Sequence, residues 1–371
     1  MNSFIPISIP SITPLEHAFV NKAVTSGWVS SMGQYIDQFE TEFATFCGVK
    51  HAISVSNGTV AIHLALAAMG IKEGDEVIIP DLTFIATASA VKLSGAKPVF
   101  VDIEDDTLGI CPSAIRKAIS PKTKAIMPVH LYGQPANMNA ILDIAKEFNL
   151  KVIEDAAEAH GALIGEKKVG SIGHAGTFSF YGNKIITTGE GGMITTNDDE
   201  LNERCRILRD HAMDKNKRYW HNELGYNYRM TNMQAALGCA QMQRISELIA
   251  KRKQIFDWYN TQLVNIDNIK LNQSNNWSTP VYWMICLEHK YFNEESRQRF
   301  MDLLKANNID SRPYFYPISD MPMFKNIQTD VTHHIYSKGI NLPTFHDITE
   351  EQVDYICKTI VKLLPNFNKK F

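Results

Sequence analysis

Short apolar runs alternate with stretches of helical periodicity through the first half of the chain. The apolar residues recur every three or four positions in the intervening stretches, as in the helix expected over 36–47. The runs have the length of buried strands and lie at 51–55, 75–80, 97–103, 124–133 and 150–157. Such alternation predicts a parallel α/β sheet with helices on both faces. Its ligand is expected at the carboxyl ends of the strands.

One stretch departs from this pattern, residues 177–197, where a lysine lies between two apolar runs. The first run ends at Tyr181, a turn follows at Gly182 and Asn183, and Lys184 precedes a glycine-rich piece. We predict a strand, a turn, a lysine-bearing loop and a second strand. Lysine is usually a solvated surface residue, and glycines let the backbone approach a ligand. The hypothesis is that Lys184 holds a carbonyl cofactor as a Schiff base.

The pattern changes again after residue 232, to one long helical stretch and then to shorter elements of both kinds. The helical stretch covers 233–263. Strands are expected at 280–287 and 309–316, and helices at 294–307 and 349–364. This organisation predicts two domains: a large α/β domain with an N-terminal arm over 1–250, and a small α+β domain over 251–371.

Composition and charge narrow the classes of function. The 371 residues carry a net charge of −3, and the isoelectric point is about 6.5, so neither nucleic acid nor an anionic membrane is an expected partner. The N-terminus lacks a signal-peptide pattern, and no run reaches the roughly 18 apolar residues of a membrane span. The six cysteines form no CxxC pair and lie at no zinc-ligand spacing. We therefore predict reduced thiols, no metal site and a cytoplasmic location.

Two more features join Lys184 at the predicted ligand edge. The Ser-Asn-Gly-Thr turn at 56–59 opens an apolar helix, and its N–H groups suit a phosphate, although many such turns bind nothing. Asp155 ends an apolar strand, where a carboxylate is costly unless it is paired. It either caps the following segment or binds a protonated pyridine nitrogen. Phosphate turn, strand-end aspartate and lysine together match the needs of pyridoxal 5′-phosphate (PLP).

These residues lie in motifs that resemble the DegT/DnrJ/EryC1/StrS family of PLP-dependent sugar aminotransferases. The motifs are SGWVSSMG, SNGTVAIHLAL, GDEVIIPDLTFIAT, PVHLYGQP, VIEDAAEAHGA, FSFYGNKIITTGEGGMITTND and GYNYRMTNMQAALG, with SRPYFYP and GINLP nearer the C-terminus. The resemblance implies the aspartate-aminotransferase architecture, PLP fold type I. Within the family, AEAHG, RYWHNELGYNYRM and SRPYFYPISDMPM are most similar to the GDP-perosamine synthases.

The resemblance implies a role for each matching residue of a cofactor site. Lys184 forms the Schiff base and moves the proton, Asp155 binds the pyridine nitrogen, and Phe84 either stacks on the ring or simply packs in the core. Glu158, where many relatives carry Gln, contacts the 3-hydroxyl side of the cofactor or the substrate. The implied phosphate ligands are Gly58, Thr59 and Ser179, with Asn227 reaching across from the neighbouring subunit of a homodimer with shared active sites.

Substrate contacts are implied on three segments. Trp28 and Ser30 lie on a loop that either packs an arm or forms a lip of the substrate pocket. The other residues implied are Arg218, Tyr219, His221, Arg229 and Tyr316. For the four between 218 and 229, surface charge or dimer contact is the alternative. Arginine suits a diphosphate because its planar fork can bond two oxygens.

The reaction implied is a transamination in two halves. L-glutamate supplies the amine, which passes to the C4 ketone of a nucleotide-linked 4-keto-6-deoxyhexose destined for surface polysaccharide such as O antigen. GDP-4-keto-6-deoxymannose is the expected acceptor, and dTDP- or UDP-4-keto-6-deoxyglucose is the alternative. Lys184 favours amine transfer, because a related branch that removes a sugar hydroxyl carries His there. Ser319 stands where perosamine synthases usually carry His. A non-catalytic regulatory or binding homologue is the rival class.

Overall fold

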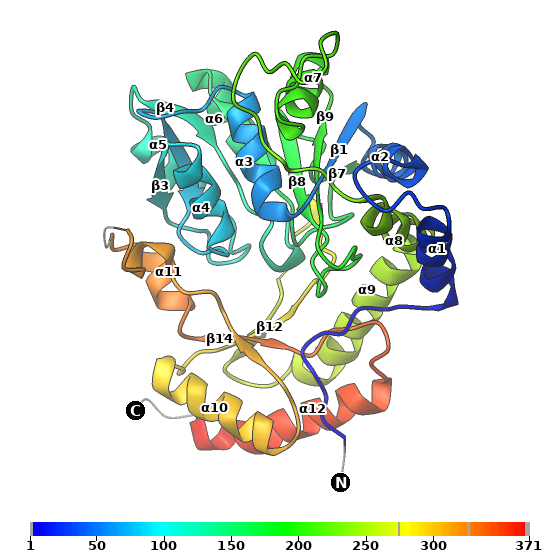
Figure 1. Ribbon diagram of the computed structural model, residues 1–371. Helices are drawn as coiled ribbons and strands as arrows, with labels where there is room; N and C mark the ends of the chain where they lie inside the picture. The colour runs from blue at the N-terminus through cyan, green and yellow to red at the C-terminus, as the bar shows by residue number, and fades with distance from the viewer. Residues whose placement is uncertain (1–2, 274, 325–326, 368–371) are drawn as a thin grey trace.

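The chain folds around a seven-stranded sheet (Figure 1). The computed structural model describes residues 3–273, 275–324 and 327–367. In spatial order the strands are β1 (His51–Val55), β9 (Gly192–Thr196), β8 (Ala175–Ser179), β5 (Lys151–Asp155), β4 (Thr123–Ile126), β2 (Glu76–Pro80) and β3 (Lys97–Val101). β9 runs antiparallel to β1 and β8, and the other neighbouring pairs are parallel. This mixed, mostly parallel sheet confirms the predicted fold class.

Helices cover both faces of the sheet (Figure 1). Strand residues point alternately to the two faces, so Ile78 joins one apolar core and Ile79 the other. The first core contains α2 (Gln34–Cys47), α5 (Pro112–Ala118), α6 (Met138–Phe148) and α8 (Asn232–Gln243). The second contains α3 (Gly58–Ala68), α4 (Ala86–Leu93) and α7 (Asp199–Arg209).

A smaller antiparallel sheet with its own apolar core forms the C-terminal part. Its strands are, in order, β10 (Ile269–Leu271), β12 (Ile285–His289), β14 (Gly339–Leu342) and β13 (Arg312–Pro313). Its core includes α9 (Ile245–Leu263), α10 (Glu294–Ala306) and α12 (Glu350–Leu363), together with Ile5 of the N-terminal arm. The predicted boundary between residues 250 and 251 falls inside α9, and this division into domains stays a prediction.

The remaining elements are short, apart from the first helix. They are α1 (Pro14–Thr25), β6 (Leu163–Ile164), β7 (Lys167–Lys168), β11 (Ser278–Thr279), α11 (Asp330–Ile335) and the 3₁₀ turns η1 (Leu131–Gly133), η2 (Ile318–Asp320) and η3 (Leu364–Phe367). All six cysteines are free, as predicted, and the cytoplasmic location stays a prediction. Within the described ranges, no helix has both the length and the apolar character needed to cross a membrane.

The predicted strands differ most from the structure at three places. The run at 124–133 leaves the extended conformation after Ile126 and ends in the η1 turn, where Tyr132 has a φ of 53°. The run at 280–287 is irregular up to residue 284, since Tyr282 also has a positive φ, of 50°. The run at 309–316 keeps only the two residues of β13, one of which is Pro313, a residue that cannot donate a ladder hydrogen bond.

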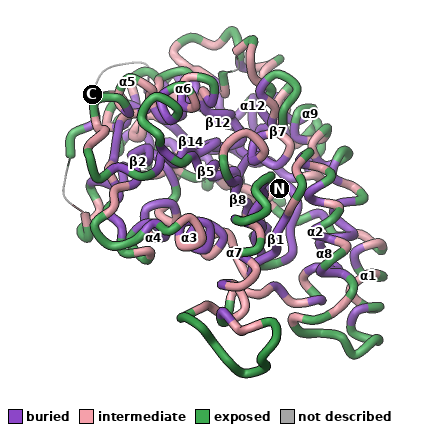
Figure 2. Tube along the Cα trace, turned by 90° about the horizontal axis from the view of Figure 1, so that it is seen from above, coloured by how far each residue is buried: buried purple, intermediate pink, exposed green. Residues whose placement is uncertain are grey.

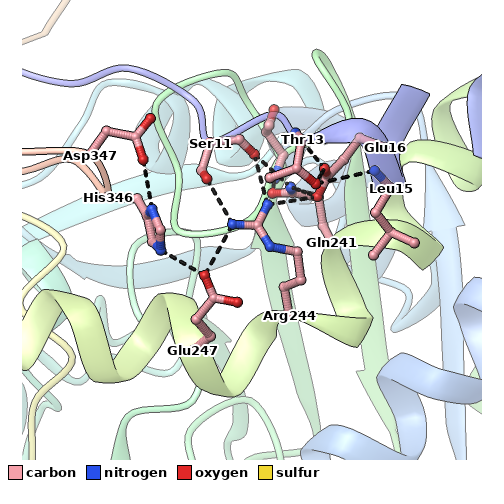
Figure 3. A network of polar contacts seen from close by, with 10 residues as sticks. Ser11, Thr13, Leu15, Glu16, Gln241, Arg244, Glu247, His346 and Asp347 are labelled. Atoms are coloured by element: carbon pink, nitrogen blue, oxygen red, sulfur yellow. Dashed lines mark hydrogen bonds and ion pairs between the residues drawn. The ribbon is translucent and has the colours of Figure 1, made fainter. Parts of the chain in front are cut away.

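The long helical stretch is broken at Arg244, between α8 and α9 (Figure 3). The guanidinium of Arg244 lies 2.9 Å from a Glu16 carboxylate oxygen and 2.9 Å from the Ser11 hydroxyl. Gln241, in the last turn of α8, donates to the same Glu16 oxygen at 2.7 Å and accepts the N–H of Thr187 at 3.3 Å. This buried network ties the N-terminal arm and the helix junction to the loop that carries Lys184.

Two strand-end carboxylates fix the C-terminal part to the large sheet. Asp81, directly after β2, is fully buried and accepts the N–H of Ser319 at 2.8 Å, the Ser319 hydroxyl at 2.8 Å and the Thr329 hydroxyl at 2.7 Å. Asp102, directly after β3, accepts the N–H of Thr332 at 2.9 Å in the first turn of α11. We call these contacts the carboxylate clasp. The clasp uses two positions of the carboxyl edge for docking, which leaves the edge of β5 and β8 for chemistry.

Candidate active site

Lys184 lies on the loop between β8 and β9, as predicted. Its N–H closes the turn onto the carbonyl of Tyr181 at 2.9 Å. The side-chain amine is 3.6 Å from a Glu158 carboxylate oxygen and 3.9 Å from the ring centre of Trp283. Burial lowers the pKa of the Lys184 amine, and the negative charges of Glu158 and Asp155 oppose that shift. A lowered pKa favours the neutral amine, which is the form that attacks a carbonyl carbon.

Asp155 is the last residue of β5 and is buried. Its Oδ2 accepts the Thr87 hydroxyl at 2.8 Å, and its Oδ1 accepts the N–H of Ala157 at 3.2 Å. Burial raises the pKa of the Asp155 carboxyl, although the Thr87 hydrogen bond, the Ala157 N–H and the charge of Lys184 lower it in part. A buried carboxyl in this state gains stability from a nearby cation, such as a protonated ring nitrogen.

Glu154, the preceding residue, has different surroundings. It lies 3.0 Å from the ring nitrogen Nε2 of His130 and accepts the N–H groups of Gly170 at 2.8 Å and Gly173 at 2.7 Å. Its carboxylate is therefore fully engaged in holding the turn before β8. Although the two acidic residues are adjacent in the sequence, only Asp155 points to the lysine side of the sheet edge.

Glu158 lies against Lys184 and is buried. Its second carboxylate oxygen accepts the N–H of Tyr132 at 2.8 Å. Burial raises the pKa of the Glu158 carboxyl, and the charge of Lys184 opposes that shift. The cofactor and substrate contacts implied for Glu158 stay predictions, and the contact with the lysine was not anticipated.

The N-terminus of α3 forms an anion cradle with Ser179. Asn57 caps the helix by accepting the N–H of Val60 at 3.0 Å. In the described part of the chain, the N–H groups of Gly58 and Thr59 have no hydrogen-bond acceptor. A methyl group on Gly58 would lie 2.8 Å from the Cβ of Ser179, so glycine allows that side chain to sit beside the helix end. Free N–H groups at the positive end of a helix suit a phosphate.

An aromatic group borders this edge. Phe84 follows β2, its side chain is 54% exposed, and its ring centre is 5.7 Å from that of Phe315. Core packing therefore does not account for Phe84. Tyr316 is half-exposed, with the guanidinium of Arg297 5.6 Å from its ring centre. Ser319 is fully buried in the carboxylate clasp, so this position holds the two parts together.

The predicted lip at Trp28 and Ser30 is organised by Asn232. The Asn232 side-chain amide donates to the carbonyl of Trp28 at 2.6 Å, and its N–H donates to the carbonyl of Ser30 at 2.6 Å. The Trp28 ring remains exposed. The loop is thus fixed in place and presents an aromatic side chain outward, and its contact with substrate stays a prediction.

The segment between α7 and α8 carries the other implied contacts, and its exposed middle, residues 215–224, projects from the body of the molecule (Figure 2). Its C-terminal end returns to the body, where the carbonyl of Tyr228 accepts the N–H of Ser56 at 2.9 Å. The guanidinium of Arg218 is 4.9 Å from the ring centre of Tyr219, and His221 Nδ1 lies 2.8 Å from the carbonyl of His211. Arg229 binds Asn227 at 2.9 Å. Among the described residues, no hydrogen bond or ion pair joins this segment to the lysine or its two carboxylates.

Three residues next to the site were missed at the sequence level. Trp283 lay in a run interpreted as a strand, and Tyr132 lay in a motif valued only for its place at a strand end. Thr87 follows Phe84 by three residues, which is one helical turn, and this spacing is the signal that would have placed its hydroxyl beside the same strand edge.

Comparison with known proteins agrees with this geometry. The profile of the DegT/DnrJ/EryC1/StrS aminotransferase family matches residues 10–361. The chain is 45% identical to GDP-perosamine synthase of Caulobacter vibrioides over 97% of this chain and 98% of that protein. It is 44% identical to GDP-perosamine synthase of Escherichia coli O157:H7, over 96% and 98%.

A solved structure shows the same fold with the predicted cofactor. A Streptococcus pneumoniae protein in a PLP form superposes with a TM-score of 0.93, at 26% identity over 99% of this chain and all of that one. The predicted fold class, PLP dependence and enzyme class are confirmed. The chain belongs to the DegT/DnrJ/EryC1/StrS aminotransferase family.

Proposed function

We propose that this family member transfers the amino group of L-glutamate to C4 of GDP-4-keto-6-deoxy-D-mannose, yielding GDP-perosamine. The observation that carries the chemistry is the buried amine of Lys184 beside two carboxylates at the carboxyl edge of the sheet. The choice of sugar rests on the similarity, over nearly the whole chain, to relatives named GDP-perosamine synthase.

The residues at this edge fit PLP. Gly58, Thr59 and Ser179 would hold its phosphate at the start of α3, since free N–H groups and a hydroxyl meet there. Asp155 would face the ring nitrogen, and Phe84, which is 54% exposed, would stack on the ring. When bound, PLP supplies an electron sink for negative charge at the carbon next to the transferred nitrogen.

The chain's own groups then do the following work. Lys184 would bond to the carbonyl carbon of the cofactor through Nζ, with loss of water, and once released from that carbon its amine would take and return a proton. The lowered pKa of Lys184 favours the neutral amine that both roles need. The Asp155 carboxylate, held in place by the Thr87 hydroxyl, would keep a proton on the ring nitrogen of the bound cofactor. Trp283, which is almost completely buried, covers one side of the amine.

A substrate panel tests the proposal. The purified protein, loaded with PLP, receives L-glutamate and GDP-, dTDP- or UDP-linked 4-keto-6-deoxyhexoses, and mass spectrometry detects the amino sugar. We expect product from the GDP-linked mannose derivative at a kcat/KM at least about fivefold above the others, because one well-placed contact to a base is worth about 1 kcal/mol or more. Preferential turnover of a dTDP- or UDP-sugar would establish the viosamine-type alternative, and no turnover of any sugar would favour a regulatory homologue.

We further propose a homodimer with shared active sites. Its support is a set of large apolar side chains that are exposed in the single chain: Trp28, Met32, Tyr219, Trp220 and Leu224. Two of the three segments with implied substrate contacts carry these side chains. A second copy of the chain would cover them and would bring Asn227 and its neighbours to the other subunit's site.

Disruption of this surface should separate the subunits. Leu224 is 93% exposed, and Leu224→Asp places a charge in the proposed interface, which should raise the dimer Kd by at least about tenfold. Sedimentation velocity measures the assembly, and Leu93→Asp, at a 67% exposed position on α4, is the matched control. A wild-type protein that sediments as a fully active monomer would disprove the shared-site dimer.

A further inference from the structure

We propose that Trp283 is a positioning residue for the free amine of Lys184, and that its indole face and the Glu158 carboxylate form a clamp for that amine. The inference rests on the role given to Lys184 in the proposed function. Trp283 belongs to the C-terminal part, so the proposal gives that part a role in the chemistry of the large domain.

The geometry of the indole supports the clamp. The amine of Lys184 is 3.9 Å from the ring centre of Trp283, within the range of a cation–π contact. The side chain of Trp283 is only 4% exposed, so water does not compete for that contact. The indole N–H donates to the carbonyl of Asn183 at 2.8 Å. Trp283 is thereby attached to the residue directly before the lysine whose amine it faces.

One turn of the large domain holds both sides of the clamp. The N–H of Tyr132 binds Glu158 at 2.8 Å, and the Tyr132 ring stacks on Trp283 with centres 6.4 Å apart and planes 15° apart. Gly133 has a φ of 92°, and a methyl group there would lie 2.8 Å from the backbone nitrogen of Trp283. Only glycine allows this close approach. The positive φ of Tyr132 and the glycine after it thus both help to place Glu158 and Trp283 on the two sides of the clamp.

The clamp acts on the proton affinity of the amine. An aromatic face and a carboxylate both favour the ammonium form, whereas burial favours the neutral form. The titratable groups that face Lys184 are Glu158, Asp155 and His160. Burial and the charge of Lys184 lower the pKa of His160 to about 3, so this ring stays neutral. The amine must both bond to carbon and carry a proton, so it needs an intermediate proton affinity. The clamp provides it by opposing the effect of burial.

The test measures the pH dependence of amine labelling in the full-length chain without cofactor. An amine-reactive reagent labels neutral Lys184, and peptide mass spectrometry gives the labelling rate across pH. In Trp283→Leu we expect the midpoint to fall by about one pH unit, and in Trp283→Phe by roughly half as much, because the cation–π contact is lost or weakened. Trp258→Leu is the matched control, since Lys251 lies 4.3 Å from the Trp258 ring centre on α9, away from the site.

Midpoints of both Trp283 variants equal to wild type would overturn the proposal. If Trp283→Leu does not fold, as a thermal melt would show, Trp283→Phe decides, because it keeps an aromatic ring.

Failure of the proposed function would be detected by a different experiment. Borohydride reduction of the PLP-loaded wild type should fix the cofactor on Lys184, and a cofactor fixed elsewhere would contradict that function while the labelling midpoints still tested the clamp.

Discussion

Replacing Lys184 with alanine is expected to abolish amine transfer, with kcat lowered by at least about 10⁴-fold. The variant loses both the nucleophile and the group that moves the proton, and among the described residues no second lysine lies within an ion-pair distance of Glu158. Release of 2-oxoglutarate from L-glutamate measures the first half of the reaction, and the amino sugar measures the second. Both should fail together.

Lys184→Arg tests whether a positive charge at this position is sufficient for activity. Arginine keeps a cation beside Glu158 but cannot lose its proton in a protein, so we expect it to be as inactive as alanine. Lys251→Ala serves as the control, because it removes a lysine that also packs on a tryptophan. Substantial activity in Lys184→Ala would mean that another group carries the reaction, and the site would have to be reassigned.

The second large effect is expected at Asp155. Asp155→Asn has nearly the same shape and can still accept the Thr87 hydroxyl, but it lacks the negative charge that keeps a ring nitrogen protonated. We expect kcat to fall about 10²–10³-fold, the size seen when one preorganised electrostatic contact is removed. The folded state should be affected little, since a buried carboxylate with a raised pKa is costly to hold.

Glu154→Gln is the control at the neighbouring residue, because it should lower stability and leave the activity of the folded protein intact. That carboxylate accepts several backbone N–H groups and contacts His130, so the amide should reduce stability by about 1–3 kcal/mol while a folded fraction stays active. Urea unfolding and turnover, measured on both variants, distinguish the cases. If the two substitutions reduced activity in proportion to their loss of stability, Asp155 would have no special place in the chemistry.

The central part of the site could be predicted because a parallel sheet gathers the ends of its strands at one edge. Asp155 and the turn before α3 stand at such ends, and Lys184 follows the end of β8. Their positions along the chain therefore indicated their proximity in space. The same logic placed Glu158 nearby, but it could not show that its partner is the lysine, because side-chain direction after a strand depends on turns such as that of Tyr132.

The contribution of the C-terminal part could not be predicted. The run around Trp283 is apolar throughout and has the composition of a strand, and nothing in it signals the positive φ of Tyr282 that breaks the extended conformation. The ligand of the segment between α7 and α8, with Arg218 and Arg229, could not be predicted for a different reason. Its function depends on a surface that a single chain does not complete, so neither pattern nor spacing within this sequence locates its ligand.

The carboxylate clasp also bears on how this scaffold can be recombined. Exchange of C-terminal parts between relatives is an obvious route to new sugar specificities, with a junction in α9. In this chain, however, the imported part must bring a hydroxyl where Ser319 and Thr329 bind Asp81, and a helix start where Thr332 binds Asp102. A donor with a bulky imidazole at 319 would need a smaller partner at 81. Chimeras should therefore exchange these positions as a set.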